Sequence, residues 1–68
     1  MTSRELIELY IELRKDLGVT QEQLADIAGY ARNSISNVEI HKSANLSTFC
    51  DLCEALGIDI ILTRRKSR

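Results

Sequence analysis

The sequence predicts an all-α fold, a bundle of four to five helices, and two observations lead to this expectation. Apolar residues recur at helical spacing along most of the 68-residue chain, which has no proline and only three glycines. This length allows one domain with a small core. We place that domain at residues 1–63 and expect a basic, flexible tail after it, Arg64–Arg68.

The first helix is expected over residues 3–17. Ser3 is suited to cap its start, and Gly18 follows its end, where a left-handed backbone commonly closes a helix. Its core face is predicted to consist of four apolar residues at helical spacing: Leu6, Tyr10, Leu13 and Leu17.

A second helix is expected to begin after Thr20 and to end near Ala28. Thr20 and Gln23 fit the capping-box pattern, in which two side chains satisfy the free amides of a helix start. The small Ala25 suits a close crossing of two helices. The residues predicted to face inward are Leu24 and Ile27.

A third, short helix is expected from about Arg32 to Val38, after a tight turn that begins at Gly29. Ile35 and Val38 are apolar where this helix must face a core, while its other face is polar. Two short helices joined by such a turn have the spacing of a helix-turn-helix, whose second helix lies in the major groove of DNA. The segment 21–40 therefore predicts a DNA-binding motif.

The fourth helix is expected after a loop that spans Glu39 to Asn45. Asn45 is suited to cap this helix, which should run to Leu56 and end at Gly57. Its buried face is predicted to consist of Leu46, Phe49, Cys53 and Leu56.

The pattern changes after Gly57, because Ile58–Thr63 is rich in β-branched residues and alternates apolar side chains. A lone strand leaves its backbone groups unpaired, so a strand here needs a partner. The economical partner is the same strand of a second copy, antiparallel about a two-fold axis. A short fifth helix that packs across a dimer is the alternative. The predicted dimerisation residues are Ile58, Ile60, Ile61 and Leu62.

The charge balance alone does not favour a nucleic-acid partner. The formal net charge is −1 and the pI is about 5.7, whereas phosphate contacts favour a basic surface. The charges are nevertheless unevenly distributed, with three glutamates in the first helix and basic residues at Arg32, Lys42 and the tail. We therefore expect a polarised molecule, with a tail that is either simply solvated or steers DNA from a distance.

Several other classes of protein are disfavoured. Cys50, Cys53 and the single His41 fall short of a four-ligand zinc site, so we expect small apolar cysteines and no metal or cofactor, with a metal or redox role as the alternative. No plausible nucleophile–base pair or phosphate-binding glycine loop is present, so an enzyme is not expected. No apolar run approaches the roughly 20 residues that span a bilayer. We expect a cytoplasmic protein without a membrane partner or small-molecule ligand.

Three motifs follow one another from Leu13: LRKDLGVTQEQLADIAG, ISNVE and LSTFCDLCEALGI. In combination they resemble the Cro/phage-repressor type (Xre family) of helix-turn-helix proteins. The resemblance implies a compact bundle of four or five helices that binds operator DNA as a dimer. Leu46–Thr63, a helix followed by an apolar strand, is similar to small Hip-type antitoxins, which are repressors that also bind a kinase toxin.

The chain departs from that family at two places. Ala31 stands where the family often has Ser or Thr, so the third helix should lack a side-chain cap, worth about 1 kcal/mol. Ile40-His41-Lys42 stands where the family usually has Asn-Gly-Lys, which changes the loop that would contact phosphates.

The outward face of the third helix is predicted to contact bases, through Arg32, Asn33, Ser36 and Asn37. Arg32 can bond both acceptors of a guanine, and Asn33 or Asn37 can pair with an adenine. The alternative for each is a solvated helix face.

Phosphate contacts are predicted for Gln21, Tyr30, Lys42 and Ser43. By resemblance, Gln21 bonds a phosphate and braces the third helix, at a helix start whose amides favour an anion. Tyr30 could instead cover the edge of the core. The resemblance also implies an internal salt bridge between Arg14 and Glu39, a structural role.

The function expected from these observations is that of a sequence-specific repressor that binds a palindromic operator as a homodimer. An antitoxin that also binds and neutralises a toxin protein is the alternative, as are a prophage regulator and a restriction–modification controller. A purely structural role without DNA is supported only by the acidic pI.

Overall fold

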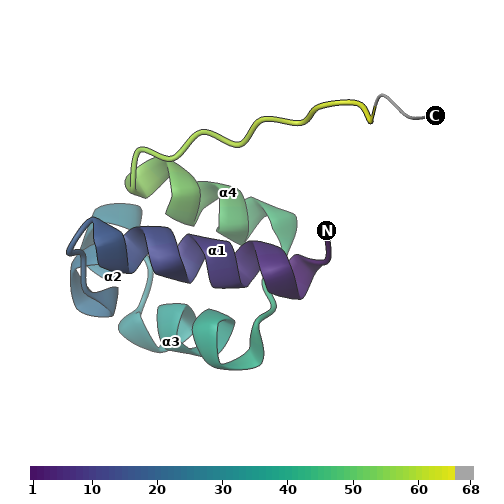
Figure 1. Ribbon diagram of the computed structural model, residues 1–68. Helices are drawn as coiled ribbons and strands as arrows, with labels where there is room; N and C mark the ends of the chain where they lie inside the picture. The colour runs from purple at the N-terminus through teal and green to yellow at the C-terminus, as the bar shows by residue number, and fades with distance from the viewer. Residues whose placement is uncertain (66–68) are drawn as a thin grey trace.

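The computed structural model describes residues 1–65 and is built from four helices around one core (Figure 1). The helices are α1 (Ser3–Asp16), α2 (Gln21–Ala28), α3 (Arg32–His41) and α4 (Leu46–Ala55). α3 packs on α1 and α2, and α4 packs on α2. The all-α prediction is confirmed, with four helices and neither a fifth helix nor a strand in residues 1–65.

Three of the four helices, α1, α2 and α4, begin with a side-chain cap, and the cap of α1 is not the predicted residue. Thr2, and not Ser3, caps α1: its Oγ1 accepts the Glu5 amide at 3.1 Å, and the Glu5 carboxylate accepts the Thr2 amide at 2.7 Å. Thr2 and Glu5 form a capping box, so the cap of α1 lies one residue earlier than predicted. The predicted caps Thr20 and Asn45 are confirmed for α2 and α4.

The core is built from the inner faces of all four helices. Its buried apolar members are Ile7, Tyr10, Leu24, Ala25, Ile35, Val38, Phe49, Leu52 and Cys53. Ring packing contributes, since Tyr10 and Phe49 meet edge to face with centroids 6.2 Å apart.

Three residues predicted to face inward are exposed instead: Leu17 at 56%, Ile27 at 62% and Leu46 at 76%. Leu17 lies past the last turn of α1, at its C-cap. In α2 the small Ala28 packs against the core one position after Ile27. Leu46 lies in the first turn of α4, ahead of the buried face that begins at Phe49.

The third helix is longer than predicted and runs through Glu39 to His41. The prediction of a loop that begins at Glu39 was therefore wrong. Lys42 ends the helix in a left-handed conformation (φ 54°, ψ 41°), the backbone shape that a glycine would adopt at lower cost.

After α4 the chain is neither helix nor strand, and residues 58–65 run back alongside α4 past the start of α1 (Figure 1). The amide of Ile58 donates to the carbonyl of Cys53 at 2.9 Å, and Ile58 is half-buried. Ile60, Ile61 and Leu62 are 44%, 79% and 93% exposed. Strand pairing with a second copy stays a prediction, as does the flexible tail, of which residues 66–68 lie outside the described part. Among the described residues, no helix is long and apolar enough to cross a membrane.

Candidate nucleic-acid interface

The turn between α2 and α3 is a short left-handed bend. Gly29 caps α2 with φ 76° and ψ 29°, a left-handed conformation in which a residue with a side chain would be strained. The amides of Gly29 and Tyr30 both donate to the carbonyl of Ala25, at 2.9 and 3.0 Å. The bend brings α3 against α2 with a fixed entry direction, which is the geometry of a helix-turn-helix.

The outer face of α3 is polar and available to solvent. Arg32, Asn33 and Asn37 are exposed and Ser36 is half-buried, while Ile35 on the opposite face is fully buried. All four residues predicted to contact bases therefore lie on one helix. Ala31 precedes them and makes no side-chain cap hydrogen bond, as its residue type implied.

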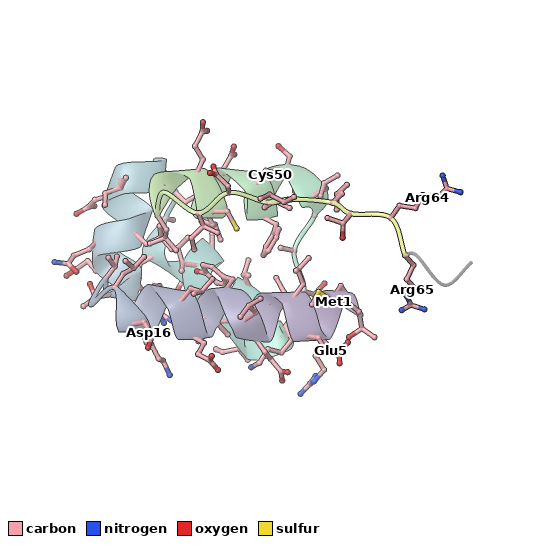
Figure 2. The ribbon with its side chains drawn as sticks, turned by 45° about the horizontal axis from the view of Figure 1, so that its top comes forward. Met1, Glu5, Asp16, Cys50, Arg64 and Arg65 are labelled. Atoms are coloured by element: carbon pink, nitrogen blue, oxygen red, sulfur yellow. The ribbon has the colours of Figure 1, made fainter. Side chains whose placement is uncertain are left out.

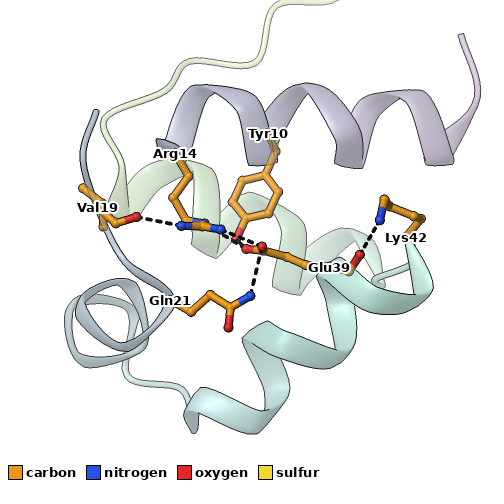
Figure 3. Close-up of polar contacts among 6 residues, drawn as sticks. All are labelled: Tyr10, Arg14, Val19, Gln21, Glu39 and Lys42. Atoms are coloured by element: carbon orange, nitrogen blue, oxygen red, sulfur yellow. Dashed lines mark hydrogen bonds and ion pairs between the residues drawn. The ribbon is translucent and has the colours of Figure 1, made fainter. Parts of the chain in front are cut away.

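A buried polar network joins α3 to α1 and α2 (Figure 3). The structure brings Arg14 and Glu39 together in a two-pronged ion pair, with Nη2–Oε1 at 2.7 Å and Nε–Oε2 at 2.9 Å. Tyr10 Oη donates to the same carboxylate at 2.8 Å and Gln21 Nε2 at 3.1 Å. Arg14 Nη1 also donates to the carbonyl of Val19 at 2.7 Å, so one carboxylate of α3 is tied to α1, to α2 and, through Arg14, to the loop between them.

This network has no orphaned polar atom, although Arg14 and Glu39 are only 6% and 7% exposed. Burial of the Glu39 carboxylate opposes its charge, but the hydrogen bonds that it accepts, led by those from Arg14, outweigh burial and lower its pKa. The pKa of Tyr10 is raised, by burial first and then by its bond to Glu39. The charged pair and the neutral phenol are thus the stable states at neutral pH.

The residues predicted to contact phosphates lie around α3, and the side chains of three of them make internal hydrogen bonds. The side-chain amide of Gln21 donates a hydrogen bond to the Glu39 carboxylate. Gln21 also lines a surface pocket together with Arg14 and Arg32. Lys42 Nζ donates to the Glu39 carbonyl at 2.7 Å, and Ser43 is exposed.

Tyr30 is the third of these engaged residues. Its hydroxyl donates to Asp51 Oδ2 of α4 at 2.6 Å, and its ring packs against the core. A phosphate contact from Tyr30 would require that bond to be given up, so the geometry favours the alternative of a residue at the core edge.

Sequence reasoning missed Tyr10 and Asp51 as polar partners. Tyr10 lies one helical turn before Arg14, and that spacing could have placed its hydroxyl near the bridge. For Asp51 the sequence offers no signal, because its partner is 21 positions away.

The two cysteines both lie on α4. In residues 1–65 no group of three or more His, Cys, Asp or Glu side chains could hold a metal ion. Cys53 is buried in the core, which raises the pKa of its thiol, and Cys50 is exposed on α4 (Figure 2).

Comparison with known proteins agrees with this geometry. A profile of the helix-turn-helix family matches residues 11–62, which include α2, the turn and α3. No curated protein and no solved structure matches the chain significantly. The profile match covers most of the chain, so this protein belongs to the Cro/C1-type helix-turn-helix (Xre) family of DNA-binding regulators.

Proposed function

We propose that this regulator is a sequence-specific repressor that binds a palindromic operator as a homodimer. The observation that carries the proposal is the polar face of α3, which presents Arg32 and Asn33 to solvent at the start of the helix. A recognition helix contacts base edges through its N-terminal residues. The buried network at Glu39 supports the proposal, because it holds the far end of α3 rigidly against α1 and α2.

The side chains on that face suit base recognition in the major groove. A guanidinium donates to both acceptors of guanine, and a carboxamide both donates to and accepts from adenine. We assign the first role to Arg32 and the second to Asn33 or Asn37, with Ser36 as a fourth base contact. Gln21, Lys42 and Ser43 would hold the phosphates on either side.

A gel shift with DNA from upstream of the protein's own gene tests this proposal. Arg32→Ala and Asn33→Ala should each weaken binding by about 1–3 kcal/mol, the typical value of a good base contact. Ser47→Ala, an exposed change on α4, serves as the control. The absence of binding at low salt, or binding indifferent to both α3 substitutions, would contradict the proposal.

The dimer would form through the C-terminal segment 58–63. No backbone hydrogen bond occurs among residues 59–65, so their amides and carbonyls are free to pair with another strand. The segment borders an apolar groove beside α1 and α4, and it exposes Ile61 and Leu62. The groove is lined by Met1, Leu6, Leu9, Tyr10, Leu13, Phe49, Cys53 and residues 58–61. Pairing about a two-fold axis would cover both the free backbone and this groove.

Leu62→Asp tests the dimer without disturbing the single chain, because Leu62 is 93% exposed there. The matched control is Thr63→Asp, which adds the same charge one position later, on the other side of an extended segment. Sedimentation equilibrium should show a dimer for the parent protein and the control, and a monomer for Leu62→Asp. A parent protein that is monomeric at micromolar concentration would contradict the dimer.

Toxin neutralisation is a second candidate function, favoured by the exposed apolar side chains at Ile61 and Leu62. Contiguous exposed apolar residues mark interaction surfaces. Co-purification with the product of the neighbouring gene tests it, and Leu62→Asp should abolish the complex if this segment carries the contact.

A further inference from the structure

The N-terminal end of α3 has no side-chain cap. Its N-cap residue is Ala31, whose side chain has no oxygen to accept a free amide of the first turn. The first backbone bonds of the helix run from Ser34 and Ile35 to the Ala31 carbonyl, at 3.0 and 3.4 Å. The Glu39 network holds the opposite end. Arg32 and Asn33, the proposed base contacts, therefore stand on an uncapped helix end.

The side-chain bond nearest to this end comes from Tyr30. Tyr30 Oη donates to Asp51 Oδ2 at 2.6 Å, which links the turn to the middle of α4, a helix that packs on α2. The Tyr30 amide is bonded to Ala25 at the same time. The residue just before the cap is thus held by its backbone to α2 and by its hydroxyl to α4.

We propose that the Tyr30–Asp51 hydrogen bond anchors the uncapped start of α3 and makes Tyr30 a positioning residue for base recognition by Arg32 and Asn33. This inference rests on the proposed function, since it assumes that α3 contacts bases. The carboxylate acceptor strengthens the bond, because bonds to charged groups are shorter and stronger than neutral ones. The pKa of Tyr30 is raised chiefly by this bond, so the hydroxyl remains a donor throughout the neutral range.

We call the Tyr30–Asp51 hydrogen bond the clamp. Amide hydrogen exchange of the free protein tests, without DNA, whether the clamp stabilises the start of α3. Tyr30→Phe removes only the hydroxyl and should speed exchange at the Ser34 and Ile35 amides about fivefold, a change that corresponds to about 1 kcal/mol. The Leu6 amide, in the capped first turn of α1, should keep its rate and thus report that the effect is local. Unchanged exchange at Ser34 and Ile35 would overturn the proposal.

Discrimination between DNA sequences tests the consequence for recognition. The probes are a duplex selected by the parent protein from random DNA and an unrelated duplex of equal length, at one salt concentration. Tyr30→Phe should reduce the preference for the selected duplex about fivefold and leave affinity for the unrelated one unchanged, because non-specific binding rests on phosphates. A loss of stability alone would leave this ratio unchanged in the folded protein.

Variants of Asp51 complete the test. Asp51→Asn keeps an acceptor oxygen and should retain most of the preference, whereas Asp51→Ala should lose it as Tyr30→Phe does. Glu54→Gln controls for the removed negative charge, since Glu54 is an exposed acid one turn further along α4. Equal effects of Asp51→Asn and Asp51→Ala, or an unchanged ratio in Tyr30→Phe, would overturn the clamp. A parent protein that prefers no DNA sequence would contradict the proposed function. The exchange rates of the Ser34 and Ile35 amides would still test whether the Tyr30–Asp51 bond stabilises the start of α3.

Discussion

Arg14→Met breaks the buried ion pair to Glu39 while it keeps most of the side-chain volume. The variant leaves a carboxylate that is 7% exposed with hydrogen bonds from Tyr10 and Gln21 but without a cation. Removing one partner of such a pair costs about 3–5 kcal/mol, because an uncompensated buried charge remains. A domain of 68 residues has a total stability of only about 3–10 kcal/mol. The substitution should therefore remove a large part of the stability.

Thermal unfolding followed by circular dichroism at pH 7 measures this loss. At about 4–8 °C per kcal/mol for a domain of this size, the midpoint should fall by more than about 12 °C. Arg4→Met is the control, because it breaks the exposed Arg4–Glu8 pair at 3.6 Å, which should be worth about 0.5 kcal/mol or less. Arg14→Met combined with Glu39→Met should be more stable than Arg14→Met alone, since no buried charge remains. An Arg14→Met protein that melts like the parent would refute this account of the bridge.

Three further predictions concern pH, the turn and salt. Because folding lowers the pKa of Glu39, the ionised carboxylate contributes its full stabilisation above the ordinary pKa of 4.5, and this stabilisation is lost as the pH falls below that value. Urea unfolding at a series of pH values should therefore show that the difference in unfolding free energy between the parent and Glu39→Gln shrinks in acid. A difference that stays constant down to pH 3 would contradict this. Gly29→Ala should lower the free energy of unfolding by about 1–2 kcal/mol through backbone strain alone, because nothing lies within 4 Å of the added carbon; an unchanged urea midpoint would contradict it. Because Lys42 is the one cation proposed to contact phosphate, a dimer should neutralise about two phosphates and give a slope of log K against log [salt] of about −1.8, and Lys42→Ala should remove most of that slope; a much steeper slope, or one that Lys42→Ala leaves unchanged, would contradict this assignment.

The fold was largely predictable because local rules decide most of it. The capping box at Thr20 and the left-handed Gly29 follow from residue types that lie close together in the chain, so short-range chemistry predicted both ends of α2. The same rule would have found Thr2, since Glu5 follows it at the right spacing. Helical periodicity was less decisive. It placed Ile27 inward, because a single helix does not reveal which neighbour covers which face.

The candidate site was predictable only in part. Arg32 and Asn33 lie where the motif put them, because the turn determines which face of α3 is outward. The extension of α3 through Glu39 was not predicted, because a charged residue in that position looks like the start of a loop until its partners in α1 and α2 are known. The Tyr30–Asp51 bond depends on the packing of α4 beside the turn, a long-range contact that no local pattern encodes.

The most direct measurement of the central claim is the DNA sequence that the protein selects from a random pool, compared with the sequence selected by Arg32→Ala. The parent protein should enrich an inverted repeat whose half-sites are centred about one helical turn, roughly 34 Å, apart. Arg32→Ala should enrich the same repeat with preference lost at one position in each half-site. A parent protein that enriches no sequence, or a variant that enriches an identical one, would contradict recognition through α3.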